Sequence, residues 1–314
     1  MAYTNTDTNM TTSSALSAGM QTYYNRELLR TFEPNLVHLQ FGDEHRMPPH
    51  SGLVMNMRKL IPLETNTKAL SEGEPGESVM LAETEVTVQL QQYGEYARCT
   101  DKLNLTHLDM DIMRRTKLFG DAGARSIDAV VREELAKCAN VIYAGGKASR
   151  AELTAADKLT SRELRKAVKT LKKNHAQTFG GYFVAIIGPD TMYDLQEDEA
   201  FVKVSQYQDK ENIYTGEVGR LFGVRLVETT EAKIFEGAGA SGADVASVIV
   251  LGQYAYGVTS LKGAKPRVIV KPAGSAGTAD PLDQISTVGW KMDGFGAKLL
   301  QPEYAVRIEC GFSA

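Results

Sequence analysis

Two stretches of the sequence, residues 53–61 and 86–91, alternate between apolar and polar side chains with a period of two. This alternation predicts two β-strands. Between them lies an acidic segment with glycine and proline, Leu70–Ser78, which predicts a turn at the tip of a long hairpin. A two-stranded hairpin is only marginally stable alone. Because many of its side chains are polar, we expect it to lie on a neighbouring copy of the chain rather than on the subunit's own core.

The stretch from Leu108 to Ala144 has a different period, with apolar or small residues at steps of three or four. This spacing places them in one stripe on a helix. The stripe comprises Met113, Thr116, Gly120, Ala124, Ile127, Val131, Leu135, Cys138 and Ile142. At 1.5 Å per residue the helix would be roughly 55 Å long. A compact domain has no place for such a helix, so the pattern indicates a thin, elongated subunit.

Residues 150–260 are expected to form an α/β unit. An amphipathic helix follows Thr160 or Ser161, and the apolar run Tyr182–Ile187 predicts a buried strand. Pro189 is expected to open a second helix. Val224–Val227 and Val245–Leu251 predict two further strands. Beyond this unit, residues 268–270 predict a short strand, and residues 304–312 predict a clearly alternating one.

Composition and charge narrow the class of protein. Of the 314 residues, 43% are hydrophobic and 24% are charged, which is typical of soluble domains, and the net charge of −4 argues against a dedicated nucleic-acid-binding protein. No run of apolar residues is long enough to cross a membrane. The first 25 residues lack Lys and Arg, so we expect no signal or transit peptide. Three widely spaced cysteines are expected to be free thiols in a reducing cytoplasm.

Candidate chemistry is sparse. Gly237–Gly242 matches GxGxxG, but an apolar run that predicts a strand follows it, whereas a dinucleotide site needs a helix there. A β-hairpin turn is therefore expected. The histidines, among them His38 and His45, have no metal-ligand spacing and are expected at the surface or an interface. The basic run 169–173 could contact phosphate, but the polar face of an amphipathic helix is more often solvated. We expect no cofactor, no metal site and no catalytic residue.

The order of these elements resembles the major capsid protein of tailed bacteriophages, whose Johnson fold is shared with herpesvirus shells and encapsulins. Four stretches carry the resemblance: residues 35–48 (NLVHLQFG, then MP), Glu72-Gly73 at the hairpin tip, residues 219–227 (GRLFGVRLV), and residues 280–291 (DPLDQ, then GWK). The resemblance implies an α+β capsid fold with an N-terminal arm, a long hairpin called the E-loop, a peripheral domain with a long spine helix and an axial α/β domain.

The resemblance also assigns these parts to residue ranges. The N-terminal arm would be 1–52, the E-loop hairpin 53–100, the peripheral domain with its spine helix 101–149, the axial domain 150–260, and the returning peripheral strands 261–314. The implied function is structural: hexamers and pentamers would close into an icosahedral shell around double-stranded phage DNA. Such a protein would be part of the virion capsid and would assemble in the bacterial cytoplasm.

Three groups of residues are candidates for assembly. We expect the hairpin tip and the N-terminal arm to contact other subunits, and two helix glycines to act as a hinge. The tip residues are Lys68, Glu72, Glu74 and Glu77, the arm residues are Tyr23, Tyr24 and Arg26, and the hinge residues are Gly120 and Gly123. Expected partners are further copies of the chain, portal and separate scaffolding or decoration proteins, and DNA contacted non-specifically, with no membrane. The alternatives are an encapsulin-type compartment or a nucleotide-using α/β enzyme.

Overall fold

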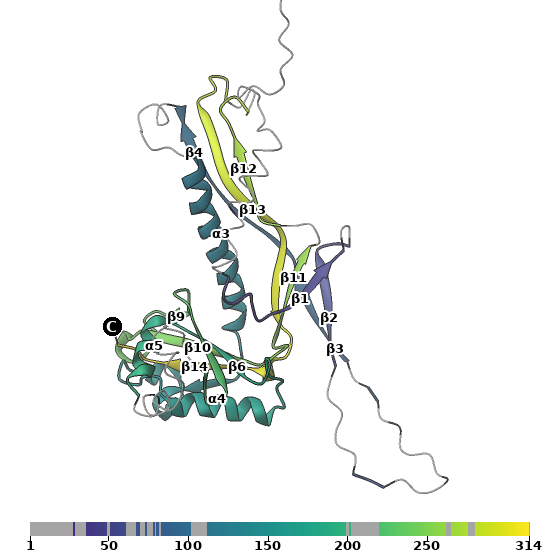
Figure 1. Cartoon of the computed structure of the whole chain (residues 1–314), viewed down its shortest axis with the longest axis vertical. Helices are drawn as coiled ribbons and strands as arrows, with labels where there is room; N and C mark the ends of the chain where they lie inside the picture. Colours follow the sequence, from purple (N-terminus) through teal and green to yellow (C-terminus); the bar gives the residue numbers. More distant parts are fainter. Residues whose placement is uncertain are drawn as a thin grey trace, which may run out of the picture.

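The computed structural model describes residues 28, 36–48, 51–60, 67–69, 73, 78, 80–81, 83–101, 112–198, 201, 220–261, 265–275 and 280–313. Figure 1 shows an elongated subunit. Helix α3 (Ile112–Leu135) lies along a long sheet, a second sheet with two helices lies at one end, and a hairpin projects from the side. The predicted α+β fold with a thin, extended outline is confirmed.

The long sheet has five strands. Its order is β1 (Asp43–Met47), β11 (Tyr256–Leu261), β13 (Ile285–Leu299) and β12 (Arg267–Lys271), and β4 (Gln91–Thr100) also pairs with β13. Strand β1 runs parallel to β11, and the other pairs are antiparallel. The apolar face of the sheet, with Val288, Trp290 and Met292, packs in one core with Ile127 and Val131 of α3. This packing explains why α3 follows the sheet along its length.

The second sheet has seven strands and lies at the end of α3. Its order is β5 (Val141–Tyr143), β14 (Ala305–Cys310), β10 (Val245–Leu251), β6 (Phe183–Ile187), β8 (Val224–Glu228) and β7 (Arg220–Leu221), with β9 (Ile234–Phe235) paired to β10. Helices α4 (Ser161–Lys173) and α5 (Pro189–Gln196) share a buried core with one face of this sheet. Single turns of 3₁₀ helix stand at Ala144–Gly146, Arg150–Glu152, Ala240–Gly242 and Pro302–Tyr304. The helices and strands predicted for residues 150–260 are thus confirmed.

The hairpin consists of β2 (Val54–Leu60) and β3 (Glu83–Gln89). The two strands pair antiparallel in a continuous register, from Val54 opposite Gln89 to Leu60 opposite Glu83. Figure 1 shows this ribbon leaving the base of the five-stranded sheet and pointing away from the rest of the subunit. The predicted hairpin is therefore confirmed, and the residues that join its strands are described only at 67–69, 73, 78 and 80–81.

The predicted position of the C-terminal end of the long helix was wrong. Helix α3 ends at Leu135, where the backbone N–H of Cys138 bonds to the Leu135 carbonyl in a tightened last turn. Residues Val141–Tyr143 form β5, parallel to β14. This run is β-branched and aromatic, and such residues favour strands. The helical spacing of Cys138 and Ile142 was coincidental, because both residues lie beyond the end of the helix. The predicted start at Leu108 lies outside the described residues.

Sheet membership differs from the expected division of the chain at residue 261. The closing strand β14, expected among the peripheral strands, lies inside the seven-stranded sheet between β5 and β10. Conversely, β11 begins before residue 260 and belongs to the five-stranded sheet. Strand β1 lies within the expected N-terminal arm but is a sheet strand as well. Buried side chains on both faces of β14 explain why it needs a central position.

Candidate assembly interface

The base of the hairpin is anchored on the subunit's own sheet. Met57 and Val88 face inward and are buried. Each of these side chains packs against a glycine of the five-stranded sheet. A Cβ built on Gly257 would lie 2.7 Å from the Met57 sulfur, and one built on Gly296 would lie 2.8 Å from Val88 Cγ1. Side chains at these two glycines would occupy the space that the hairpin fills. The expectation that the hairpin avoids the subunit's own core was therefore wrong for its base.

An ion pair adds a polar contact to this anchor. Lys59 of β2 places its Nζ 2.8 Å from Oε2 of Glu303, which belongs to the 3₁₀ turn before β14. The hydrogen bond from Lys59 lowers the pKa of the Glu303 carboxyl below its usual value. Because the Glu303 side chain is 56% exposed, the pair contributes less than about 1 kcal/mol. It orients the hairpin more than it stabilises it.

Farther from the base, the hairpin exposes apolar side chains. Met80 is 92% exposed and Leu81 is 74% exposed. Lys68 is exposed as well, whereas Glu72, Glu74 and Glu77 lie outside the described residues. Large apolar side chains gathered on a projecting element are typical of a surface that another molecule covers. The outer hairpin is therefore the first candidate contact surface.

A buried clamp holds the segment before β1 onto α3. The backbone N–H of His38 donates to Asp128 Oδ1 at 2.7 Å, and its ring Nδ1 lies 2.5 Å from Asp128 Oδ2. The Tyr256 hydroxyl donates to the His38 carbonyl, and burial raises the pKa of that hydroxyl. The prediction of a surface or interface position was thus wrong for His38, which is 1% exposed. The arm residues Tyr23, Tyr24 and Arg26 lie outside the described residues.

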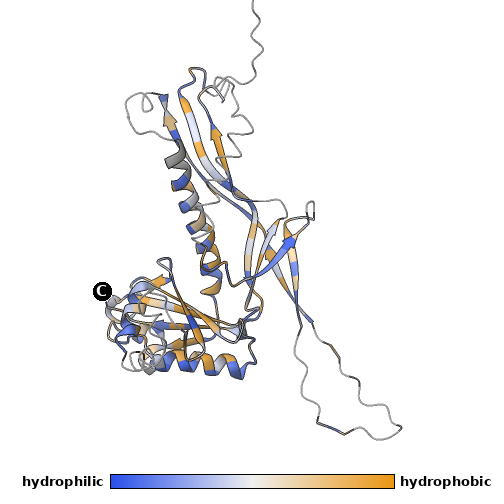
Figure 2. Cartoon of the chain, in the orientation of Figure 1, coloured by the Kyte–Doolittle hydropathy of each residue, from blue (hydrophilic) through white to orange (hydrophobic). Residues whose placement is uncertain are grey.

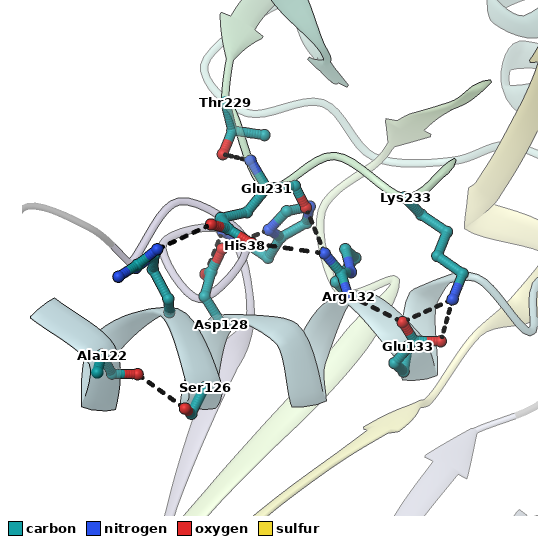
Figure 3. Close-up of polar contacts among 10 residues, drawn as sticks. His38, Ala122, Ser126, Asp128, Arg132, Glu133, Thr229, Glu231 and Lys233 are labelled. Carbon is teal, nitrogen blue, oxygen red and sulfur yellow. Dashed lines mark hydrogen bonds and ion pairs between the residues drawn. The ribbon is translucent and has the colours of Figure 1, made fainter. Parts of the chain in front are cut away.

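A second polar network joins α3 to the loop between β8 and β9, as Figure 3 shows. Arg132 donates from Nη1 to the Glu231 carbonyl at 2.9 Å and from Nη2 to Glu133 at 3.0 Å. Lys233 bonds both Glu133 oxygens, at 2.8 and 2.9 Å. Burial acts to raise the pKa of Glu133, but hydrogen bonds and charges from Lys233 and Arg132 outweigh it and lower that pKa. The network fixes the seven-stranded sheet relative to the helix.

The two expected hinge glycines lie about one turn apart on α3. Gly120 and Gly123 are both buried, and the described helix continues through them without interruption. Just beyond them, the Ser126 hydroxyl donates to the Ala122 carbonyl at 2.7 Å. A bond of this kind competes with the helix ladder and slightly weakens it. The hinge stays a prediction, because a single conformation does not test it.

The glycine-rich segment that matches GxGxxG is a turn between two strands. Gly237–Gly242 lies in the turn that joins the antiparallel pair β9 and β10, as predicted, and the Gly237 N–H donates to Asp244 at 2.6 Å. A strand follows this turn, so no helix N-terminus meets a phosphate there. Among the described residues, no group of three or more His, Cys, Asp or Glu is placed to hold a metal. None of the described helices is long and apolar enough to span a membrane.

A family model identifies the family of this chain, and solved structures share its fold. A family model described as phage capsid protein matches residues 83–308. A search of curated proteins finds no match. The capsid of Ralstonia phage GP4 has the same fold, with a TM-score of 0.67 at 15% identity over 100% of this chain and 98% of that one.

Two cyanophage capsids give similar results. The chain from P-SCSP1u has a TM-score of 0.65 at 16% identity, over 87% of both chains. The chain from Pam1 has a TM-score of 0.64 at 15% identity, over 100% of this chain and 98% of that one. At these identities the likeness shows a shared fold, and the family match identifies the kind of protein.

Proposed function

Because this chain belongs to the phage capsid protein family, we propose that its copies assemble as hexamers and pentamers into the icosahedral shell of a tailed phage, around double-stranded DNA. The projecting hairpin carries this proposal. Its base is anchored on the subunit's own sheet, but its outer part exposes Met80 and Leu81 to solvent. A neighbouring subunit is the simplest partner that would cover them in every copy.

Each segment takes a role in this scheme. The hairpin of β2 and β3 reaches over an adjacent subunit, and the arm before β1 adds a second contact through Tyr23, Tyr24 and Arg26. The five-stranded sheet with α3 forms the peripheral domain, and the seven-stranded sheet with α4 and α5 forms the axial domain at the five- and six-fold axes. Portal, scaffolding or decoration proteins and the packaged DNA are the other partners. The shell assembles in the host cytoplasm and has no enzymatic role.

Two alternatives are less well supported. A nucleotide-using enzyme would need a phosphate site at Gly237–Gly242, and that segment is a hairpin turn. An encapsulin-type compartment would share the fold, but the family match is to phage capsid proteins. The contents of purified particles, DNA or protein cargo, distinguish a capsid from such a compartment.

Electron microscopy of the purified protein tests the proposal. We expect closed shells from the wild-type chain. The double variant Met80→Ser with Leu81→Ser is expected to fold normally, because both side chains are exposed, yet to assemble poorly. Leu282→Ser is the matched control, since Leu282 is 75% exposed on another part of the subunit. Normal shells from the double variant would contradict the proposed hairpin contact. If the wild type formed neither shells nor sheets, the proposal that this chain forms a shell would be wrong.

The helix glycines belong to a separate step of the same proposal. We propose that α3 bends at Gly120 and Gly123 when a precursor shell expands. Replacing both by alanine favours the straight helix by about 1 kcal/mol per residue. The variant is expected to assemble but to expand more slowly, measured by the change in shell diameter over time. Expansion at the wild-type rate would exclude the hinge.

A further inference from the structure

Helix α4 carries an unusual concentration of positive charge. Its thirteen residues, SRELRKAVKTLKK, contain six Lys or Arg and one glutamate, although the whole chain has a net charge of −4. Arg162, Arg165, Lys169, Lys172 and Lys173 are exposed, and the apolar residues of the helix are buried against the seven-stranded sheet. Figure 2 shows the corresponding alternation of hydrophilic and hydrophobic colours along α4. We define these five exposed side chains as the basic row.

The basic row follows one side of the helix. Steps of three and four residues connect Arg162 to Arg165, Lys169 and Lys172, so these side chains share a face. The row extends over about 16 Å at 1.5 Å per residue. Figure 1 shows α4 at the lower edge of the sheet domain, on the side away from α3. The row therefore forms a linear array of charge on the solvent-exposed side of α4.

Several basic side chains elsewhere in the described residues have carboxylate partners, and the basic row has none among those residues. Arg125 of α3 pairs with Asp121 at 2.9 Å, Arg132 with Glu133 at 3.0 Å, and Lys59 with Glu303 at 2.8 Å. Along α4, the ion pair within the described residues joins Lys166 to the buried Glu163 at 3.6 Å. The helix dipole accounts for cations near the C-terminus, such as Lys172 and Lys173. It disfavours Arg162 in the first turn, so helix stability alone does not explain the row.

We propose that the basic row is a contact surface for the phosphate backbone of double-stranded DNA, the polyanion inside the shell. This inference rests on the proposed function. Helix α4 carries no aromatic side chain for base stacking, which favours duplex phosphates over single-stranded bases. The apolar face of α4 is already buried, so the helix cannot insert into a lipid surface. Three of the five side chains are lysines, which are depleted in protein–protein interfaces, and this argues against a second subunit as the occupant.

The proposal predicts how strongly salt weakens the binding of this chain to DNA. A protein that neutralises Z phosphates loses affinity with a slope of about −0.9Z in a plot of log K against log salt. Five contacts predict a slope of about −4.5, which is an affinity loss of about 500-fold between 50 and 200 mM salt. Removing two contacts predicts a slope of about −2.7 and a loss of about 40-fold over the same range.

The test measures binding of the full-length, unassembled chain to a fluorescent duplex of about 20 base pairs and random sequence. The variant Lys169→Gln with Lys172→Gln is compared with Lys147→Gln with Lys265→Gln, which removes the same charge at exposed positions outside α4. We expect the shallower slope only in the α4 variant, and recovery of the wild-type slope in Lys169→Arg with Lys172→Arg. Equal slopes for the α4 variant and its control would overturn the proposal.

Electron microscopy of the same variants distinguishes the proposed DNA contact from the proposed role of the chain in forming the shell. If the α4 variant forms normal shells and loses duplex binding, the DNA contact is supported. If it binds DNA like the wild type but fails to assemble, the basic row is a subunit contact and the proposal is wrong. If the wild type binds duplex with the predicted slope but never forms shells, the proposed function fails while the DNA contact stands.

Discussion

Glu309 on β14 allows the most stringent test of how the subunit is held together. Its carboxylate is fully buried between two arginines. Arg150 donates to it from Nε at 2.7 Å and from Nη2 at 2.6 Å, a bidentate pair. Arg307 Nε lies 2.8 Å from Oε1, but its N–H direction does not make a hydrogen bond, so Arg307 interacts mainly through charge. Glu309 thus holds the segment after β5 against the closing strand.

The substitution Glu309→Gln keeps the shape of the side chain and removes its charge. Arg150 has a partly exposed side chain and can reach solvent, whereas that of Arg307 is 10% exposed and would be left buried beside a neutral amide. Breaking a buried pair from one side costs about 3–5 kcal/mol. Because Gln still accepts one hydrogen bond, we expect a loss near the lower bound, about 3 kcal/mol.

Urea unfolding of the unassembled subunit, followed by circular dichroism, measures this loss. Glu303→Gln is the control, since it removes a carboxylate from a largely exposed pair and should cost less than about 1 kcal/mol. A loss below about 1 kcal/mol for Glu309→Gln, with an unchanged denaturant slope, would refute the reasoning. Such a result would mean that both arginine side chains can turn into solvent without disturbing the packing of the sheet.

Other contacts lead to further predictions. Met57→Ala should destabilise the hairpin base by about 2–3 kcal/mol and expose β2–β3 to limited proteolysis, and resistance equal to that of the wild type would contradict the anchor. Asp128→Ala should leave the His38 N–H without its acceptor and speed amide exchange in residues 36–41, while Asp128→Asn, which keeps an acceptor, should have a smaller effect. The lowered pKa of Glu303 means that its pair with Lys59 stabilises the hairpin above the ordinary glutamate pKa and is lost as pH falls through the lowered value. The protection factors of the β2 amides, corrected for the intrinsic pH dependence of exchange, should therefore fall on acidification, and they should fall less in Glu303→Gln.

Local pattern was sufficient where one face of an element meets the core. The alternation in β3 and the helical spacing of Leu164, Val168 and Leu171 predicted the right elements, because burial in both cases follows the period of the backbone. The same reasoning failed for β13, where Gly289, Gly294 and Gly296 interrupt the apolar alternation. Close approach of the neighbouring strand explains the small residue at the first of these positions, since a Cβ on Gly289 would lie 2.5 Å from the Glu95 carbonyl oxygen.

Contacts between residues far apart in the sequence explain the remaining predictions that were wrong. Nothing near His38 in the sequence indicates that Asp128, ninety residues away, accepts a hydrogen bond from its backbone N–H. The alternation of β14 predicted a strand, but it did not show that the charged Arg307 and Glu309 are buried, with Arg150 pairing with that glutamate from a distant turn. The resemblance to phage capsid proteins provided the family, and the pattern alone provided most elements. The candidate tip and arm residues depend on assembled neighbours and stay predictions.

The attachment of the hairpin to the subunit's own sheet has a mechanical consequence. Seven paired residues extend about 23 Å at roughly 3.3 Å per residue, and Met57, Val88 and Lys59 hold them to the subunit along this length. The paired strands therefore move with the sheet as one body. Rotating the sheet at its base by about 10° would carry the far end of the paired strands about 4 Å, more than one residue of strand length. A modest reorientation of one subunit is thus enough to shift which residues of the next subunit its hairpin meets.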